Sequence, residues 1–353
     1  MVHVVKPATI YDVAKAAGVS HQTVTRYLRG FEGIRPATKE RVQRALIDLD
    51  YRPNGAARQL RSQRSNRIGI LAHRMEISGP GQFITGAVRA AQSRGYLVDI
   101  ASVDGDDDQS VEQALGMLLE HRVSGIFATS QTQIIHDALE KYPFDVPISL
   151  ASNRTGSSLN DPVAAMPGVL AAAHLVELGH DRLGFVAGPA GWLGSLHSYN
   201  GFLAEAQRRG ASVLWTAEGD WTAQSGWKVA HEAPISALGI SAVGVANDSM
   251  AIGFISGMHS RGVKVPDDLS VTGVDNAPDS QFFLPALSTV SVDFSGAGAY
   301  LMLSLIATIE GGEQPQQSHL GMHLIPRDST RAHRSASPES LKSSPIKHTW
   351  PPQ

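Results

Sequence analysis

The sequence predicts a small all-α head with a helix-turn-helix, followed by a larger α/β core of two lobes. The chain has 353 residues, which is more than one small domain needs. Residues 1–65 hold 12 lysines and arginines against 5 aspartates and glutamates, whereas the remaining residues hold 18 against 28. Beyond residue 66, short apolar runs alternate with helical stretches. A basic head on an acidic body indicates a polyanion-binding module joined to a second function.

The composition excludes several classes of protein. The sequence contains no cysteine, which excludes disulfide scaffolds, cysteine-ligated zinc, iron–sulfur clusters and thiol nucleophiles. No apolar stretch approaches the roughly 18 residues of a membrane span, and the N-terminus lacks the pattern of a signal peptide. We therefore expect a soluble cytoplasmic protein that does not contact a membrane.

Residues 8–29 predict two short helices separated by a turn. Apolar residues recur at helical spacing on both sides of Gly18, which can supply the turn. Thr9 and Asp12 suit the start of the first helix as an N-cap and its partner, and Ser20 suits the start of the second. Two short helices joined by such a turn form a helix-turn-helix, whose second helix enters the major groove of DNA.

The second helix carries side chains that suit base reading. His21, Gln22, Thr25 and Arg26 are expected on its outward side, opposite its apolar residues. Glutamine can pair with adenine and arginine with guanine through two hydrogen bonds. A solvated amphipathic helix is the plain alternative. A third helix over residues 36–49, also basic, favours DNA binding.

Residues 52–65 predict a hinge that cannot hold a helix by itself. Pro53 ends the preceding helix, and Asn54 can cap a short new one. A helix this short is unstable in water, and Gly55 weakens it by about 1 kcal/mol relative to alanine. The plain alternative is therefore a flexible, protease-sensitive linker.

From residue 67 onward, the alternation of strand-like and helix-like segments is typical of parallel α/β sheets. The length favours two similar lobes over a single open sheet. The expected strands are 68–72, 96–102, 124–130, 146–152, 182–188, 242–247 and 269–275, and the expected helices are 81–94, 109–121, 167–178, 195–209 and 249–261. Open α/β sheets bind ligands at the C-terminal ends of their strands, so we expect a ligand there.

The sequence resembles the LacI/GalR family of bacterial repressors. The head motif TIYDVAKAAGVSHQTVTRYL and the later motifs EGDWTAQSG, VANDSMAIG and DLSVTGVD carry the resemblance, which spans roughly residues 8–331. The resemblance implies a periplasmic-binding-protein-like core with two lobes and three crossovers. It also implies a homodimer, because paired heads read a pseudo-palindromic operator in double-stranded DNA.

The resemblance implies DNA-binding roles for residues of the head and hinge. They are Thr9, Ser20, His21, Gln22, Thr25, Arg26, Asn54, Ala57 and Leu60. In this family the hinge folds on the operator, and a leucine at the position of Leu60 enters the minor groove. A hinge that folds only on DNA can act as a switch, because anything that separates two hinges melts it.

The resemblance also implies an effector pocket between the lobes. The expected pocket residues are Ser152, Ser198, Trp221, Asn247, Asp275 and Phe294. Carboxylates and amides suit sugar hydroxyls, and an aromatic face can stack on a pyranose. Three positions depart from the family, since Ser198 and Gly105 stand where arginines are usual and Ser152 where an aspartate is usual. These departures argue against a plain galactoside and leave open another sugar, a glycoside with a bulky aglycone, or a non-sugar effector.

We therefore expect a DNA-binding repressor of carbohydrate-utilisation genes, located in the bacterial cytoplasm and at the nucleoid when bound to DNA. We expect no catalytic residues, cofactor or metal ion. A regulator with a non-sugar effector, a cytoplasmic solute-binding receptor and an α/β enzyme are the alternatives. The basic head disfavours the receptor, and the lack of a nucleotide or catalytic motif disfavours the enzyme.

The expected domains follow from these boundaries. The helix-turn-helix domain covers residues 1–51, the hinge 52–65 and the core 66–333. Within the core, one lobe is expected over about 66–164 with 292–323, and the other over 165–291 with 324–333. Residues 334–353 are rich in serine and proline and are expected to be disordered.

Overall fold

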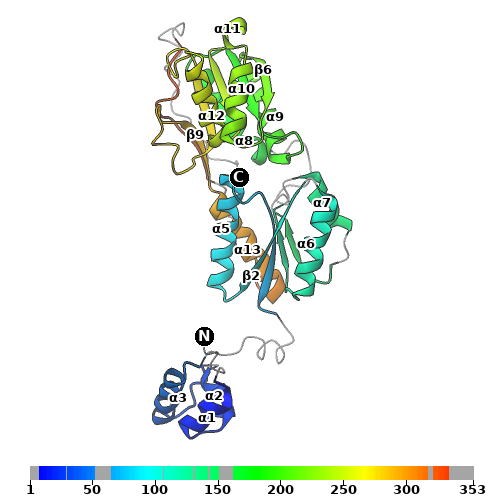
Figure 1. Ribbon diagram of the computed structural model, residues 1–353, viewed down its shortest axis with the longest axis vertical. Coiled ribbons are helices and arrows are strands. Elements are labelled where there is room, and N and C mark those ends of the chain that lie inside the picture. The colour runs from blue at the N-terminus through cyan, green and yellow to red at the C-terminus, as the bar shows by residue number, and fades with distance from the viewer. Residues whose placement is uncertain are drawn as a thin grey trace, which may run out of the picture. The chain divides into compact units, whose positions relative to one another are not determined.

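The computed structural model describes residues 8–28, 30–51, 65–105, 107–129, 132–141, 144–150, 162–316 and 321–333. The chain divides into two compact units between Ser65 and Asn66. The smaller unit is helical and the larger is an α/β core (Figure 1).

The small unit is a three-helix head. It consists of α1 (Ile10–Ala17), α2 (His21–Leu28) and α3 (Pro36–Asp48). Thr9 and Asp12 form the expected capping box at the start of α1, and Gly18 ends that helix in the left-handed conformation, with a φ of 62°. One valine from each helix (Val13, Val24 and Val42) is fully buried, so the three helices share a single core.

The first lobe of the core contains a four-stranded parallel sheet in the order β2-β1-β3-β4. Its strands are β1 (Arg67–His73), β2 (Leu97–Val103), β3 (Ile126–Ala128) and β4 (Ile148–Leu150). Its helices are α5 (Ser78–Ser93), α6 (Asp108–Glu120), α7 (Gln133–Lys141) and α13 (Phe294–Glu310). Successive residues of β1 alternate between the two faces, so that α5 and α13 cover one face and α6 and α7 the other (Figure 1).

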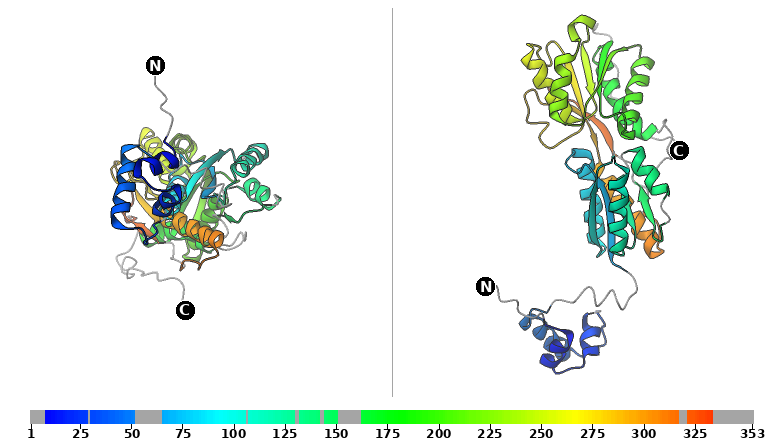
Figure 2. Two further views of the ribbon diagram at one scale, coloured as in Figure 1. Left: turned by 90° about the horizontal axis from the view of Figure 1, so that it is seen from below. Right: turned by 45° about the vertical axis from the view of Figure 1, so that its right-hand side comes forward.

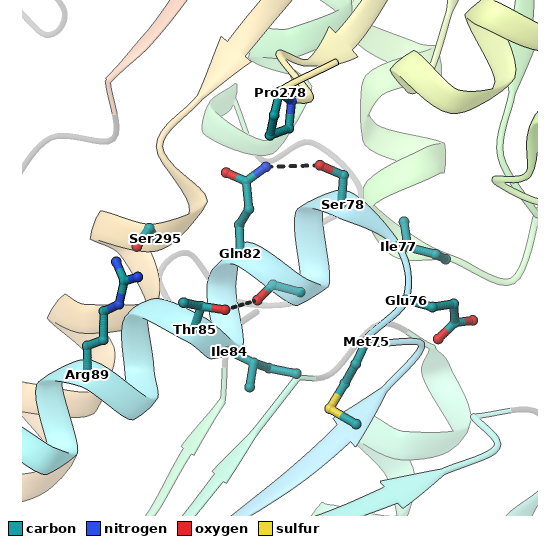
Figure 3. Close-up of a pocket in the computed structure, with 11 residues that line it drawn as sticks. Met75, Glu76, Ile77, Ser78, Gln82, Ile84, Thr85, Arg89, Pro278 and Ser295 are labelled. Atoms are coloured by element: carbon teal, nitrogen blue, oxygen red, sulfur yellow. Dashed lines mark hydrogen bonds between the residues drawn. The ribbon is translucent and has the colours of Figure 1, made fainter. Parts of the chain in front are cut away.

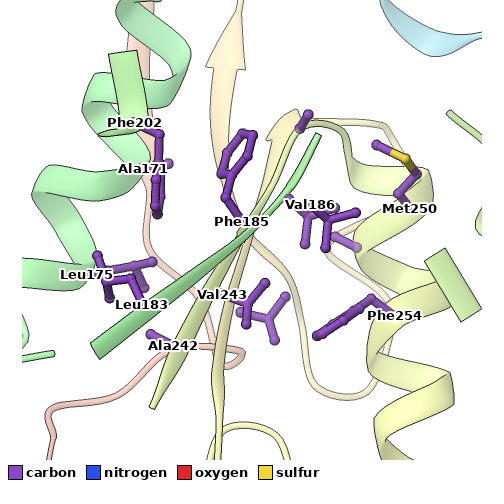
Figure 4. Packing of buried hydrophobic residues seen from close by; sticks show 14 of the residues in the cluster. Ala171, Leu175, Leu183, Phe185, Val186, Phe202, Ala242, Val243, Met250 and Phe254 are labelled. Carbon is purple, nitrogen blue, oxygen red and sulfur yellow. The ribbon is translucent and has the colours of Figure 1, made fainter. Parts of the chain in front are cut away.

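The second lobe contains a six-stranded sheet in the order β10-β9-β8-β7-β5-β6. Its strands are β5 (Arg182–Ala187), β6 (Ser212–Glu218), β7 (Ala242–Val245), β8 (Ser270–Asp275), β9 (Ser288–Val292) and β10 (Met322–Ile325). Its helices are α8 (Pro162–Glu177), α9 (Leu193–Arg208), α10 (Ala223–Glu232), α11 (Ile235–Leu238) and α12 (Asp248–Ser260). Figure 2 shows helices on both faces of this sheet, and Figure 4 shows Phe202 and Phe254 packed on opposite sides of it.

The lobe boundary differs slightly from the expected one. The chain leaves the second sheet after β9, contributes α13 to the first lobe beside α5, and returns as β10, which pairs antiparallel with β9. Val292 and the pair Met322 and His323, which we expected in the first lobe, therefore belong to the second sheet. The sequence does not mark where the chain passes from one lobe to the other, because the strands and the helix at this crossover are all apolar.

Two helices begin earlier than expected. The segment from Ser78 to Gly81 forms the first turn of α5, although it contains two glycines and a proline. Proline is tolerated there because the first N–H groups of a helix have no intrahelical partner. Helix α8 begins at Pro162 and contains Pro167, the residue at which we expected it to start. Six further elements that the sequence did not separate are β6, α7, α10, α11, β9 and α13.

Candidate DNA-reading helix and effector site

Helix α2 is anchored on one face and exposed on the other. Val24 is fully buried, Gln22 and Arg26 are exposed, and His21 and Thr25 are half-buried. The backbone N–H of Thr23 donates to the Ser20 hydroxyl at 3.2 Å, which confirms Ser20 as the helix cap. The buried valine therefore fixes which side chains α2 can present to a ligand.

Neighbouring side chains limit the freedom of three expected DNA-contacting residues. The His21 ring lies 5.2 Å from the ring of Tyr11, and the Arg26 guanidinium lies 5.6 Å from the ring centroid of Phe31. The Thr25 hydroxyl donates to the His21 carbonyl at 2.9 Å. Gln22, by contrast, is exposed and so keeps the reach that base reading requires.

The Thr9 hydroxyl makes two hydrogen bonds at the start of α1. It donates to the Asp12 carboxylate at 2.7 Å and accepts from the Asp12 N–H at 3.3 Å.

The expected hinge contacts Asn54, Ala57 and Leu60 lie outside the described residues, as does the expected pocket residue Ser152.

The loop after β6 is tied to the start of α12 through two of the expected pocket residues. Asn247 caps α12 by accepting from the Met250 N–H at 2.9 Å, and its side-chain amide donates to the Trp221 carbonyl at 3.1 Å. Trp221 has a φ of 72°, a left-handed conformation that is uncommon for a non-glycine residue. Its indole packs against Gly188, where a Cβ atom would come within 2.2 Å of the ring. Trp221 is thus held in place from both sides.

A stack of three rings joins the two lobes at this point. Trp192, in the loop after β5, lies 5.4 Å from Trp221 and 4.9 Å from His73, at the end of β1 in the first lobe. Trp192 is only 5% exposed and also forms a backbone bridge with Thr132 of the first lobe. The sequence did not identify Trp192, because no motif marks it; the only signal was an aromatic residue shortly after the AGP turn.

The ring of His73 explains why Gly105 lacks a side chain. A Cβ atom at Gly105 would lie 2.5 Å from Cε1 of His73, and the Gly105 carbonyl accepts from the Thr132 hydroxyl at 2.8 Å. Any larger side chain at this position would collide with the imidazole. The packing of His73 therefore favours glycine here.

Two buried carboxylates lie close together: Asp275 at the end of β8 and Asp248 at the start of α12. Burial raises the pKa of Asp275 well above its usual value, and the neighbouring charge of Asp248 raises it further. Burial also raises the pKa of Asp248, to about 6, although hydrogen bonds from the Thr289 hydroxyl and the Ala277 N–H oppose the shift. Burial and the neighbouring charge thus favour the protonated form of Asp275, in which the carboxyl can donate a hydrogen bond as well as accept one.

The remaining expected pocket residues occupy different surroundings. Phe294 begins α13 and packs against the hydrophobic cores of both lobes. Ser198 is buried on α9 where that helix crosses α8 at Gly168, and its hydroxyl has no hydrogen-bond partner among the described residues. The geometry thus places Trp221, Asn247, Asp275 and Phe294 at the lobe junction or the strand ends, and Ser198 within a helix contact.

A groove of about 640 Å³ follows the first half of α5 (Figure 3). Its lining includes Gln82, Thr85 and Arg89 of α5, Ser295 of α13 and Pro278 of the second lobe. Gln82 donates to the Ser78 hydroxyl at 2.9 Å. None of the helices within the described residues is long and apolar enough to cross a membrane.

Comparisons with known proteins agree with both units. A model of the lacI family of bacterial regulatory proteins matches residues 9–54, and a model of the periplasmic binding protein-like domain matches residues 172–330. The lactose operon repressor of Escherichia coli K12 is 30% identical over 347 residues, which covers 96% of each chain. The repressor PurR of Edwardsiella ictaluri is 29% identical and covers 88% of this chain and 93% of its own. A solved structure of the lac repressor dimer bound to operator and the anti-inducer ONPF superimposes with a TM-score of 0.80, at 29% identity, over 93% of this chain and all of that one.

Proposed function

The chain belongs to the lacI family of bacterial regulatory proteins and is a DNA-binding transcription repressor with an effector-binding core, and we propose that a neutral carbohydrate or glycoside controls its affinity for the operator. Membership of a family of transcription regulators agrees with the expectation that the chain is not an enzyme. We further propose that it represses genes for carbohydrate use and acts in the cytoplasm, at the nucleoid when bound to DNA.

One observation carries the DNA-binding half of this proposal. Buried Val24 and the Ser20 cap hold α2 so that Gln22 and Arg26 are exposed, which is the arrangement of a helix that reads the major groove. We propose that His21 and Thr25 contact bases beside them, and that Thr9 and Ser20 contact phosphates. Because a single head covers half a site, the chain would act as a dimer on a pseudo-palindrome. The lac repressor structure that superimposes with a TM-score of 0.80 contains a dimer bound to its operator.

We assign the transmission of the signal to residues 52–65, which separate the head from the core. Asn54, Ala57 and Leu60 are proposed to contact DNA once the segment folds on the operator, with Leu60 in the minor groove. Residues 1–51 and 66–333 would then be the reading and sensing domains. The segment 334–353 is not assigned a function.

The effector-binding half rests on Trp221, whose carbonyl accepts from the Asn247 amide, and on the buried Asp275 at the end of β8. An indole face suits the apolar side of a pyranose, while the amide and the carboxyl suit hydroxyl groups. Phe294 and Ser152 are proposed to complete the site, and Ser198 to lie at its margin. Neutral ligands are favoured because the two positions where arginines are usual hold Ser198 and Gly105.

A non-sugar effector is the second candidate. The half-buried indole of Trp221, which Trp192 supports, would suit a flat heterocycle as well as a glycoside, since both present an apolar face. The two candidates share the same site and differ only in the compound that occupies it.

The experiment uses the full chain in two steps. Selection from a random duplex library should yield a pseudo-palindromic operator, and Gln22→Ala and Arg26→Ala should each weaken binding to it by about 1–3 kcal/mol while changing the preferred base. Leu60→Ala should weaken operator binding far more than binding to random DNA. Recovery of no operator, or an operator affinity that survives deletion of residues 1–65, would overturn the DNA-binding assignment.

The second step screens monosaccharides, disaccharides, aryl glycosides and nucleobases by thermal shift and then measures operator affinity with each hit. A sugar or glycoside that raises the melting temperature and lowers operator affinity supports the first candidate, whereas a nucleobase that does so supports the second. Asp275→Ala should remove the response to the hit and leave operator binding intact. An unchanged response in that variant would place the effector elsewhere.

A further inference from the structure

Helix α7 of the first lobe carries three potential metal ligands on adjoining positions. His136, Asp137 and Glu140 each offer one ligand atom, and these atoms all lie within 4.8 Å of one another. His136 and Glu140 are four residues apart, the spacing that places two ligands on one face of a helix. The cluster does not include any residue proposed to bind the effector.

The imidazole of His136 provides a second, independent observation. The residue is 9% exposed, and its Nδ1 atom is buried without a hydrogen-bond partner among the described residues. Buried polar atoms in proteins are almost always satisfied, and an unsatisfied one calls for an explanation such as a bound ion. Nδ1 lies 3.6 Å from Oε1 of Glu140, which is too long for a hydrogen bond.

The same distance suits two ligands of one ion. Zinc binds imidazole nitrogen and carboxylate oxygen at about 2.0–2.2 Å in tetrahedral geometry, so neighbouring ligand atoms stand about 3.3–3.5 Å apart. The separation of 3.6 Å between Nδ1 and Oε1 is close to that value. Small rotations of the exposed side chains of Asp137 and Glu140 can complete the geometry, because exposed carboxylates change rotamer at little cost.

The surroundings of the cluster also fit a bound cation. Gln133 donates to Oδ1 of Asp137 at 2.7 Å, which orients one carboxylate without neutralising it. The start of the helix is fixed, since the Thr132 hydroxyl accepts from the Ile135 N–H and the Thr132 carbonyl accepts from the His136 N–H. The two carboxylates would offset the charge of a divalent ion.

We propose that His136, Asp137 and Glu140 form a binding site for a zinc ion, with water as a fourth ligand. An imidazole with two carboxylates suits zinc better than calcium or magnesium, which prefer six or more oxygen ligands or retain most of their water. From the sequence we expected no metal ion. A histidine with carboxylates at the next and the fourth following positions was the available signal.

His121 and Asp99 provide a matched control, because His121 follows α6, which covers the same face of the first sheet as α7. Nδ1 of His121, next to α6, lies 3.6 Å from Oδ2 of Asp99, the same distance as in the proposed site. That pair has no third ligand among the described residues: Asp99 instead faces Arg67 at 3.3 Å, and the His121 side chain is 54% exposed. If a histidine and a carboxylate at this distance were sufficient, zinc would bind at both pairs. If three ligands are required, zinc binds only at the cluster on α7.

Calorimetric titration of the full, chelator-stripped chain with zinc chloride tests the proposal. We expect one saturable site per chain, an affinity at least about tenfold lower in Glu140→Gln, Asp137→Asn and His136→Gln, and no change in His121→Gln. The two carboxylate variants alter exposed side chains, so circular dichroism should show them folded even if the histidine variant is not. Magnesium chloride should give no saturable binding.

Two results would overturn the proposal. One is the absence of saturable zinc binding, which would mean that the contact between His136 and Glu140 does not serve a metal ion. The other is zinc binding that survives in both carboxylate variants, which would assign the zinc to other histidines of the chain.

Discussion

The indole ring of Trp192 lies 4.9 Å from the imidazole ring of His73 and so joins the two lobes of the core. Both residues are almost fully buried, and the second contact of Trp192, with Trp221, belongs to the loop that Asn247 holds. A ligand that moves one lobe against the other must therefore alter this contact. These ring contacts connect the proposed effector residues to the first lobe, which directly follows the hinge in the chain.

Replacing Trp192 with alanine should destabilise the core strongly. Loss of a buried tryptophan costs about 3–5 kcal/mol, because it removes apolar contacts and leaves a cavity. Urea unfolding of the full chain measures the loss. Trp227→Ala is the control, since Trp227 is 43% exposed and its loss should cost much less. Equal effects of the two substitutions would mean that the stack does not hold the lobes together.

A methyl group at Gly105 should also be destabilising, for a steric reason. Its Cβ would lie 2.5 Å from the His73 ring, which is itself packed against Trp192, so the imidazole could not move without disturbing the stack. We expect Gly105→Ala to cost about 1–3 kcal/mol of unfolding free energy. The matched control is Gly116→Ala on α6, where a Cβ meets no atom within 4 Å and should stabilise by about 0.5–1 kcal/mol. A stabilising effect at both positions would contradict the proposed packing.

Much of the architecture could be predicted from the sequence, because local signals and packing agree there. The capping box of Thr9 and Asp12, the turn at Gly18 and the burial of Val24 all follow from spacing and side-chain chemistry. The buried strands β1, β5 and β8 were visible as apolar runs between turn residues. Their order in the sheets, however, depends on crossovers that leave no local mark.

The site was harder to predict than the fold, because its contacts join distant segments. Trp192, His73 and Thr132 come from three separate segments of the chain, and only the packing of the two lobes brings them together. The assignment of Trp221, Asn247 and Asp275 to the pocket came from the resemblance and stays a prediction. The contact between Gly105 and the His73 ring left no signal in the sequence, because 31 residues separate them.

The buried Asp248 should make stability fall as pH rises. Its pKa in the folded chain is about 6, above the usual 3.8, chiefly because burial penalises the charged form. The folded state therefore binds the proton more tightly, and the stabilisation is complete below pH 4 and lost as pH rises through 6. Relative to Asp248→Asn, which cannot ionise, the wild type should lose about 3 kcal/mol between pH 4 and 7.

Urea unfolding at several pH values measures this difference. Asp279→Asn, which removes one exposed carboxylate from the loop after β8, controls for the change in net charge. A difference between the wild type and Asp248→Asn that stays constant from pH 4 to 7 would show that Asp248 titrates as it does in the unfolded chain.

Two buried histidines hold the segment after β10 against the second lobe. Nε2 of His180 contacts the Arg331 carbonyl at 3.0 Å and its Nδ1 contacts the Ser241 hydroxyl at 2.9 Å, while Nε2 of His174 contacts the Thr330 hydroxyl at 2.9 Å. Burial lowers the pKa of both imidazoles to about 4, and the repulsion between them contributes at His174. Both rings are therefore neutral at physiological pH. In that state His180 donates from Nε2 to the carbonyl and accepts the hydroxyl at Nδ1.

Acidification should therefore weaken this end of the second lobe. Because the folded pKa lies below the usual 6.5, the unfolded chain binds the proton more tightly, so the stabilisation is complete above pH 6.5 and lost as pH falls toward 4. We expect the wild type to lose about 3 kcal/mol per histidine over that range, and His180→Asn to lose correspondingly less, since asparagine keeps a donor and an acceptor but does not titrate. Urea unfolding at pH 7, 6, 5 and 4 measures both chains, with His121→Asn as the exposed control. If His180→Asn and the wild type lose the same stability on acidification, the buried imidazole is not the group whose protonation loosens the segment.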